Sequence, residues 1–214
     1  VRTNLWGYAQ EEDLTTIYKN GQHLLALINE ILDMAKIEAG KMTLAFELIS
    51  LSELARTVHA ITRGLIKEED IELIWTITPK LPQIEADPIR IRQILINLLS
   101  NAAKFTSQGE IELLMDQTTP GFVHIAVRDT GIGIAEEDYD KLFAAFEQVD
   151  SSTTRVAGGT GLGLPITNWL INMHGGSISV ESELNKGTTF HVQLPVKQLR
   201  RNDKNSFFSS SILN

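Results

Sequence analysis

The chain contains no cysteine among its 214 residues. Disulfide bonds and thiolate metal sites are therefore excluded, and cysteine usage says nothing about the compartment. Long apolar runs are also absent, since the run at 94–99 is far shorter than the roughly 18 to 20 residues of a membrane-spanning helix. No basic-then-apolar signal peptide stands at the start. We expect a cytoplasmic fragment without membrane contact of its own, although its parent protein can be membrane-anchored.

Positive charge is scarce. The 19 Lys and Arg residues face 27 Asp and Glu residues, which gives a formal net charge of -8. Proteins that bind nucleic acid usually carry a clustered excess of basic residues, so nucleic acid is not an expected partner. An acidic protein can still bind an anionic ligand through backbone amides and a metal ion. The 43% hydrophobic and 21% charged residues are ordinary globular proportions, sufficient for one or two cores.

The N-terminal 41 residues carry a helical heptad pattern between positions 12 and 39, closed by Gly40. Apolar or small residues alternate steps of three and four along this stretch. Leu25 and Leu32 widen the stripe, which favours a helix bundle over a two-stranded coil alone. Because one helix cannot bury such a stripe by itself, we expect a homodimer through this segment. The residues of the seam are Leu14, Ile17, Gly21, Leu24, Ile28, Ile31 and Ala35.

Residues 42–196 mix helices and strands. Ser50 to Glu53 resembles a capping box that opens a second helix with Leu51, Leu54, Val58, Ile61 and Leu65 on its buried face. Asp87 and Pro88 open a third helix that runs to about Lys104. A short helix at 136–143 and another at 162–174 follow. Strands are predicted at 42–49, 71–77, 110–115, 122–128, 177–182 and 188–194.

The order of these elements never follows strict βαβ alternation. The predicted fold class is therefore α+β, a mostly antiparallel sheet with helices on one face, preceded by the helical segment. We expect three parts: a partial helical segment at 1–41, the α+β domain at 42–196, and a flexible tail at 197–214, which is basic and then serine-rich.

Three glycine-containing segments lie at the edges of these elements: 129–134 (DTGIGI), 158–164 (GGTGLGL) and 187–190 (GTTF). Glycine lets the backbone approach a ligand closely, and a glycine loop that runs into a helix points free amides at an anion. Phosphate is the natural candidate. Neither a Walker A motif nor a Rossmann fingerprint is present. Each segment alone is equally consistent with a simple turn.

The third helix places Asn97, Asn101 and Lys104 on one face, at steps of four and three. Carboxamide oxygens can help to coordinate Mg²⁺ between phosphates, and an ammonium group can neutralise a terminal phosphate. A solvated helix face is the simpler interpretation of these three residues taken alone.

Together, these segments resemble the ordered motifs of sensor histidine kinases. Residues 97–106 (NLLSNAAKFT) are similar to the N box, 129–134 to the first glycine box, 143–146 to the F box, and 159–163 and 187–190 to the second and third glycine boxes. Residues 31–40 also resemble the junction between dimerisation helices and the ATP-binding domain. The resemblance covers about 24–196 and implies the Bergerat fold that gyrase-type ATPases share.

The resemblance also implies a set of site residues. Asp129 is expected to accept the adenine amine, with Gly131, Gly133 and Ile134 around the base and Thr188 near it. Asn101 would be the principal Mg²⁺ ligand and Asn97 its neighbour, while Lys104 contacts phosphate. Residues 147–157 would form a mobile ATP lid, and Arg155 in it either reaches the γ-phosphate or is simply solvated. The expected phosphate and F-box residues are Gly159, Gly161, Leu162, Gly163 and Phe146.

The implied activity is a sensor histidine kinase core that binds Mg-ATP, transfers the γ-phosphate to a histidine and passes it to a response-regulator aspartate. ATP hydrolases of this fold typically have a glutamate at the position of Asn97, and an amide has no basic electron pair to activate water. Kinase is thereby favoured over a GHKL-type ATPase. A non-catalytic, ATP-binding regulatory module is the further alternative, although intact Asn101 and Asp129 weigh against it.

The acceptor histidine of the family is followed by an acidic residue, a hydrophobe, Arg-Thr and Pro or Asn. None of His23, His59, His124, His174 and His191 has this setting. Positions 1–5 (VRTNL) resemble the residues immediately after such a histidine, so we expect this fragment to bind nucleotide without phosphorylating itself. His174 is expected at a helix C-terminus, where it suits the helix dipole.

Overall fold

A computed structural model describes residues 5–66, 70–144 and 160–198 of the chain. The chain divides into two compact units, 1–42 and 43–214. The first contains one helix, α1 (Leu5–Glu38), which begins seven residues before the start expected at position 12. Gly40 ends it with a φ of +63°, as the glycine stop predicts.

The heptad stripe of α1 is open to solvent in the single chain. Its large apolar side chains are between 45% and 67% exposed, and they are Leu14, Ile17, Leu24, Leu25, Ile28, Ile31 and Leu32. None of the helices that the structure describes has both the length and the apolar character that a membrane crossing requires.

The second unit is built on a five-stranded sheet in the order β2-β4-β5-β7-β6. Its strands are β2 (Asp70–Ile77), β4 (Gln108–Asp116), β5 (Phe122–Asp129), β6 (Ser177–Glu183) and β7 (Gly187–Pro195). Only the β2–β4 pair is parallel, and the other three pairs are antiparallel. The predicted fold class, a mostly antiparallel sheet with helices, is confirmed.

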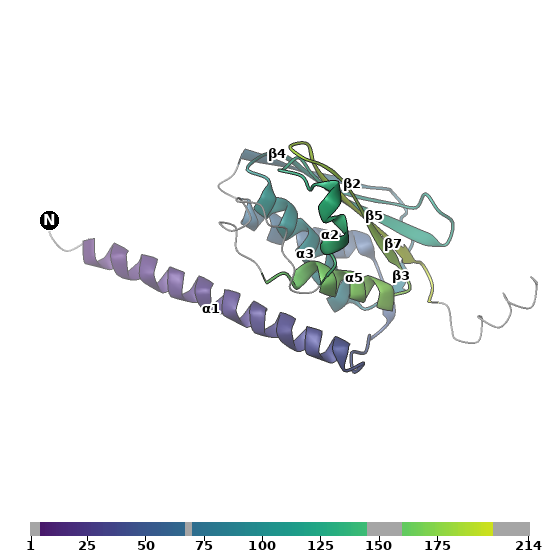
Figure 1. The fold of residues 1–214 in the computed structure, drawn as a ribbon, viewed down its shortest axis with the longest axis horizontal. Coiled ribbons are helices and arrows are strands. Elements are labelled where there is room, and N and C mark those ends of the chain that lie inside the picture. The colour runs from purple at the N-terminus through teal and green to yellow at the C-terminus, as the bar shows by residue number, and fades with distance from the viewer. Residues whose placement is uncertain (1–4, 67–69, 145–159, 199–214) are drawn as a thin grey trace, which may run out of the picture. The chain divides into compact units, whose positions relative to one another are not determined.

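Three helices pack on one face of this sheet: α2 (Leu51–Leu65), α3 (Pro88–Phe105) and α5 (Gly163–Met173) (Figure 1). Two short strands, β1 (Glu47–Ile49) and β3 (Ile84–Ala86), form an antiparallel pair of their own. β1 is only the last part of the strand expected at 42–49, and β3 was not predicted from the sequence. The short helix expected at 136–143 is a 3-10 helix, η1 (Glu136–Lys141).

Helix starts follow the predicted capping chemistry. The Ser50 Oγ accepts the Glu53 amide at 3.3 Å, and Asp87 Oδ1 accepts the amides of Ile89 and Arg90 at 3.0 and 3.1 Å. The buried face of α2 differs from the expected one, because Leu51, Ala55, Val58 and Thr62 are buried whereas Ile61 and Leu65 are 40% and 52% exposed.

The core lies between α3 and the sheet. One face of α3 is fully buried and packs against the inward-facing residues of β4 and β5, as hydrophobic burial on a single helix stripe requires. The buried residues of α3 are Ile91, Ile94, Leu95, Leu98, Leu99 and Ala102, and those of β4 and β5 include Ile111, Leu113, Met115, Ile125 and Val127.

A buried histidine ties the start of α3 to the end of α5. The His174 Nδ1 donates to the Leu170 carbonyl at 2.7 Å, and its Nε2 accepts the Asp87 amide at 3.1 Å. These fixed backbone partners select the neutral ring with its proton on Nδ1. His174 does cap α5, as expected, but burial lowers its pKa despite the Leu170 bond and the Asp87 charge, so it serves as a neutral acceptor and not as a cation at the helix dipole.

We predict that this histidine makes the fold sensitive to mild acid. Its pKa is lowered from about 6.5 in the folded state, so the unfolded chain binds the proton more tightly. The contribution of His174 to stability is present above about pH 7 and is lost as the pH falls through the folded pKa. Urea unfolding at pH 7.5 and 5.5 should show this loss, and His174→Gln should reduce it. His59→Gln is the matched control, and an unchanged pH response of His174→Gln would refute the assignment.

Candidate functional site

The first glycine segment begins at the end of β5 with a buried carboxylate. Asp129 is 7% exposed, and its Oδ1 accepts the Gly131 amide at 2.9 Å. Burial raises the pKa of Asp129, while hydrogen bonds from the Gly131 and Thr188 amides act in the opposite direction and favour the ionised form. Two backbone donors thus hold a carboxylate whose remaining electron pairs can accept hydrogen bonds from a ligand.

Asp129 belongs to a row of polar side chains that crosses three strands. It pairs with Thr188 of β7, and Thr188 pairs with Ser182 of β6. Directly paired residues of antiparallel strands project from the same face, so the three side chains are lateral neighbours on the helix-covered face. The Ser182 and Thr188 hydroxyl oxygens are 2.9 Å apart.

The segment 129–134 is held by backbone contacts from both sides. The Ile132 amide donates to the Phe105 carbonyl at the end of α3, and the Ile132 carbonyl accepts the Asn185 amide from the β6–β7 turn at 2.8 Å. A Cβ on Gly131 would overlap the Phe105 carbonyl, and one on Gly133, where φ is +67°, would overlap the Glu183 carbonyl. Glycine is needed at both positions because the backbones touch.

The polar face of α3 meets the start of α5. The Asn97 Nδ2 donates to the Thr167 Oγ1 at 2.6 Å, and a Cβ on Gly163 would lie 2.5 Å from the Asn97 Oδ1. The carboxamide oxygen of Asn97 therefore lies against the first turn of α5. Asn101 follows one turn later on α3 and is half-buried.

Lys104 lies at the last turn of α3. Its ammonium is 4.9 Å from the centre of the Phe105 ring, and burial lowers its pKa. The second glycine segment enters α5 through Gly161, with a φ of +70°, and the buried Leu162, whose amide donates to the Thr160 Oγ1 at 3.2 Å.

The structure thus joins three of the predicted motifs. The segment 129–134 contacts the end of α3 and the β6–β7 turn, and Asn97 of α3 contacts the start of α5. This assembly contains a buried carboxylate, a glycine backbone that a ligand can approach closely, and a helix N-terminus beside a carboxamide oxygen. Together these features suit a ligand that has both an anionic group and a ring with hydrogen-bonding groups. The predicted residues Phe146, Arg155 and Gly159 lie outside the described residues.

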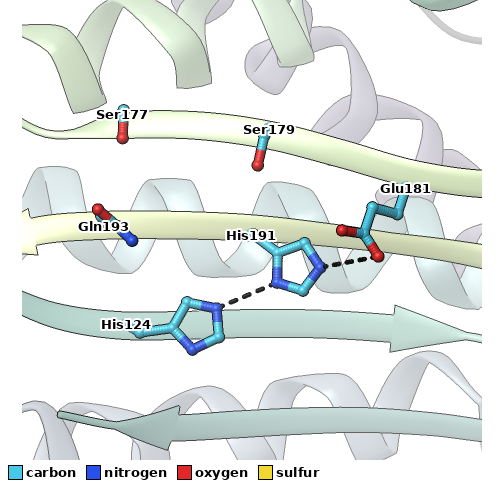
Figure 2. Close-up of a pocket in the computed structure, with 6 residues that line it drawn as sticks. All are labelled: His124, Ser177, Ser179, Glu181, His191 and Gln193. Carbon is cyan, nitrogen blue, oxygen red and sulfur yellow. Dashed lines mark hydrogen bonds and ion pairs between the residues drawn. The ribbon is translucent and has the colours of Figure 1, made fainter. Parts of the chain in front are cut away.

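A second polar cluster, not anticipated from the sequence, lies on the open face of the sheet (Figure 2). The His124 Nε2 and His191 Nδ1 form a hydrogen bond of 3.0 Å in a hollow of about 310 Å³. Their outer nitrogens face Asp116 at 3.4 Å and Glu181 at 3.8 Å. Within the part of the chain that the structure describes, no three His, Asp or Glu side chains are arranged to hold a metal ion. Only the register of β5 against β7 brings the two histidines together, and the sequence carries no local signal for this pair.

Comparison with known proteins places the site in a family. The model of the histidine kinase-, DNA gyrase B- and HSP90-like ATPases matches residues 86–198, which include α3 and both β-hairpins of the site. The non-motile and phage-resistance protein of Caulobacter vibrioides is 44% identical over 195 residues. The circadian input-output histidine kinase CikA of Synechococcus elongatus is 44% identical over 193 residues. These alignments each cover 89% of this chain.

The chain spans only 22% and 26% of the length of these two relatives. Among solved structures, full-length ShkA in complex with AMPPNP matches 89% of this chain and 40% of its own, with a TM-score of 0.77 and 34% identity. The catalytic domain of the histidine kinase ThkA, in a nucleotide-free form, matches 72% of this chain and 98% of its own, with a TM-score of 0.63 and 31% identity.

The predicted resemblance to the ATP-binding domain of sensor histidine kinases and the predicted Bergerat fold are therefore confirmed. Because the family model extends over more than half of the chain and over the segments that form the site, the chain belongs to the family of histidine kinase-, DNA gyrase B- and HSP90-like ATPases.

Proposed function

We propose that the chain is the Mg-ATP-binding core of a protein-histidine kinase of a two-component system. The observation that carries this proposal is the buried Asp129 carboxylate, held by the Gly131 and Thr188 amides beside a glycine-bounded backbone. A carboxylate at this place accepts the exocyclic amine of adenine, and that hydrogen bond offsets part of its desolvation. Gly133 and Ile134 would bound the base.

The α3–α5 junction suits the phosphates. The amides of Gly159, Gly161 and Gly163 and the N-terminus of α5 after Leu162 would cradle them, and Lys104 would neutralise charge. Mg²⁺ would supply positive charge to offset that of the phosphates. Asn101 is proposed as its principal protein ligand and Asn97 as its neighbour. The placement of the Asn97 oxygen against Gly163 supports the fit, since carboxamide oxygens are suitable Mg²⁺ ligands.

Kinase chemistry is favoured over hydrolysis by the environment of Asn97. Its amide nitrogen donates to Thr167, and its oxygen is no general base, so this side chain cannot activate water. The protein would instead position the γ-phosphate for in-line attack by a histidine ring nitrogen. The phosphoryl group would then pass to a response-regulator aspartate. Arg155 is proposed to contact the γ-phosphate and Phe146 to border the lid.

We also propose that the chain dimerises through α1. The exposed Leu14 to Leu32 stripe supports this, because seven large apolar side chains on one helix favour burial against another helix. A monomer in light scattering at high protein concentration would contradict this part of the proposal.

Asp129→Asn is expected to weaken ATP binding at least about a hundredfold, since a directional, charge-assisted acceptor is replaced by an amide that can turn its donor toward the adenine amine. Isothermal titration of Mg-ATP measures the change. Asp116→Asn, the same substitution on the open face, is the matched control and should bind ATP as the unmodified chain does. Equal affinity of Asp129→Asn and the unmodified chain would remove the basis of the proposal.

Asn101→Ala is expected to abolish the increase in ATP affinity that Mg²⁺ produces. The physical reason is the loss of the principal protein oxygen assigned to the cation. Titrations of ATP with Mg²⁺ and with EDTA give the two affinities for each variant. Asn172→Ala, which removes an exposed amide from α5, should keep the Mg²⁺ dependence. If Asn101→Ala also keeps it, another residue holds the metal.

With γ-labelled Mg-ATP, the chain is expected to retain nucleotide while it releases little phosphate and gains little acid-labile label. The reason is that Asn97 provides no base for water and that none of the five histidines has the acceptor setting. Retained nucleotide, released phosphate and acid-labile protein phosphate are measured in the same reaction. Rapid release would favour an ATPase, and strong acid-labile labelling would identify one of the five histidines as an acceptor.

A further inference from the structure

Ser182 connects the first and third glycine segments through a single hydroxyl group. It lies on β6, and its Oγ is 2.8 Å from the Ile134 amide, 2.8 Å from the Gly187 carbonyl and 2.9 Å from the Thr188 hydroxyl. Ile134 belongs to the first glycine segment, and Gly187 and Thr188 belong to the third.

The roles of these three contacts are fixed by chemistry. A backbone amide can only donate and a backbone carbonyl can only accept. The Ser182 oxygen must therefore accept from Ile134 and donate its one proton to Gly187. Its second electron pair remains for Thr188, so the Thr188 hydroxyl must donate its proton to Ser182 if all three hydrogen bonds are made. The Thr188 oxygen then has only electron pairs left for a ligand.

Tyr139 of η1 holds Ser182 in this arrangement. The Ser182 amide donates to the Tyr139 hydroxyl at 2.7 Å, and the Tyr139 hydroxyl donates to the Ser182 carbonyl at 2.5 Å. The backbone of Ser182 is thus bound on both polar groups by one side chain. This double contact anchors the backbone of Ser182, from which its hydroxyl reaches Ile134, Gly187 and Thr188.

We infer that Ser182 is a specificity-determining residue that keeps the Thr188 hydroxyl an acceptor and so makes the site select a 6-amino purine over a 6-oxo purine. This inference rests on the proposed nucleotide-binding function. Thr188 lies between Ser182 and Asp129 in the row across β6, β7 and β5. With its proton donated to Ser182, Thr188 presents the same hydrogen-bonding character as Asp129. An exocyclic amine matches two acceptors, whereas a 6-carbonyl leaves them unpaired.

The test compares ATP with inosine triphosphate, which carries a carbonyl where adenine has its amine. Affinities of both nucleotides are measured by titration for the full chain and its variants. The unmodified chain should prefer ATP. In Ser182→Ala the Thr188 proton is released to donate to a 6-carbonyl, so the ATP preference should fall about tenfold, the magnitude of one hydrogen bond at a buried group. The affinity for ATP itself should change less than the ratio.

Ser179→Ala is the matched control, because Ser179 lies on the same strand and faces the open hollow. It should keep the ATP preference. If Ser182→Ala acted only by disturbing the structure, it would weaken the binding of both nucleotides equally and leave the ratio of their affinities unchanged. This result would overturn the inference. Thr188→Val provides a second approach if Ser182→Ala does not fold, since it removes the oriented hydroxyl and retains the other two Ser182 bonds. An unchanged ratio in Thr188→Val would also overturn the inference.

A double variant tests the coupling. Since Ser182 acts through Thr188, adding Ser182→Ala to Thr188→Val should not lower the ratio further. A further tenfold fall would show that Ser182 acts independently and would contradict the inference. Failure of the unmodified chain to bind any nucleotide would instead contradict the proposed function, so the two failures are distinguishable.

Discussion

A buried carboxylate, Asp129, is the constraint on which the arrangement of the site depends. An ionised group at 7% exposure is costly unless donors surround it, and the Gly131 and Thr188 amides supply them. To place both amides there, the chain must turn sharply after β5 and β7 must pair with β5 up to Asp129. This turn brings its backbone into contact with the carbonyls of Phe105 and Glu183. These contacts leave no room for a Cβ at Gly131 or Gly133.

Hydrogen bonds at both ends of the helix α3 link the Asp129 segment to the rest of the domain. Its first turn is fixed by Asp87, which caps the helix, accepts the Ala45 amide at 2.9 Å and donates its own amide to His174. Its last turn is fixed by Phe105, whose carbonyl accepts the Ile132 amide. Asn97 lies between these two anchors and contacts α5. The polar face of α3 is therefore positioned by hydrogen bonds at both ends and by the apolar core beneath it.

Local signals in the sequence predicted the elements well and the contacts between them less well. The capping residues Ser50 and Asp87 located two helix starts because capping is a local interaction. The predicted buried face of α2 was partly right, since Leu51 and Val58 are buried. It was wrong for Ile61 and Leu65, which are exposed, and it missed the smaller Ala55 and Thr62, which are buried instead. Close packing of helices depends on their separation, which no local pattern contains.

The same holds for the site, where single residues could be predicted from the sequence but the contacts between strands could not. Glycine spacing and the α3 face identified Asp129, Asn97 and their neighbours, but the role of Ser182 follows only from the register that aligns it with Thr188. The His124–His191 pair was missed for the same reason, because two histidines 67 positions apart become neighbours only when β5 and β7 pair.

The strand register also separates the two polar clusters, since successive side chains of a strand point to opposite faces. On β6, Ser182 faces the helices while Glu181 faces the open hollow, and on β7 the paired Thr188 and the more distant His191 are divided in the same way. A shift of β6 by one residue would bring Glu181 beside Thr188 and place a second carboxylate on the same face of the sheet as Asp129. Two carboxylates at that place would repel each other in a buried setting. The Glu183–Gly187 turn that fixes this register therefore protects the hydrogen-bonding pattern of the site as well as the sheet.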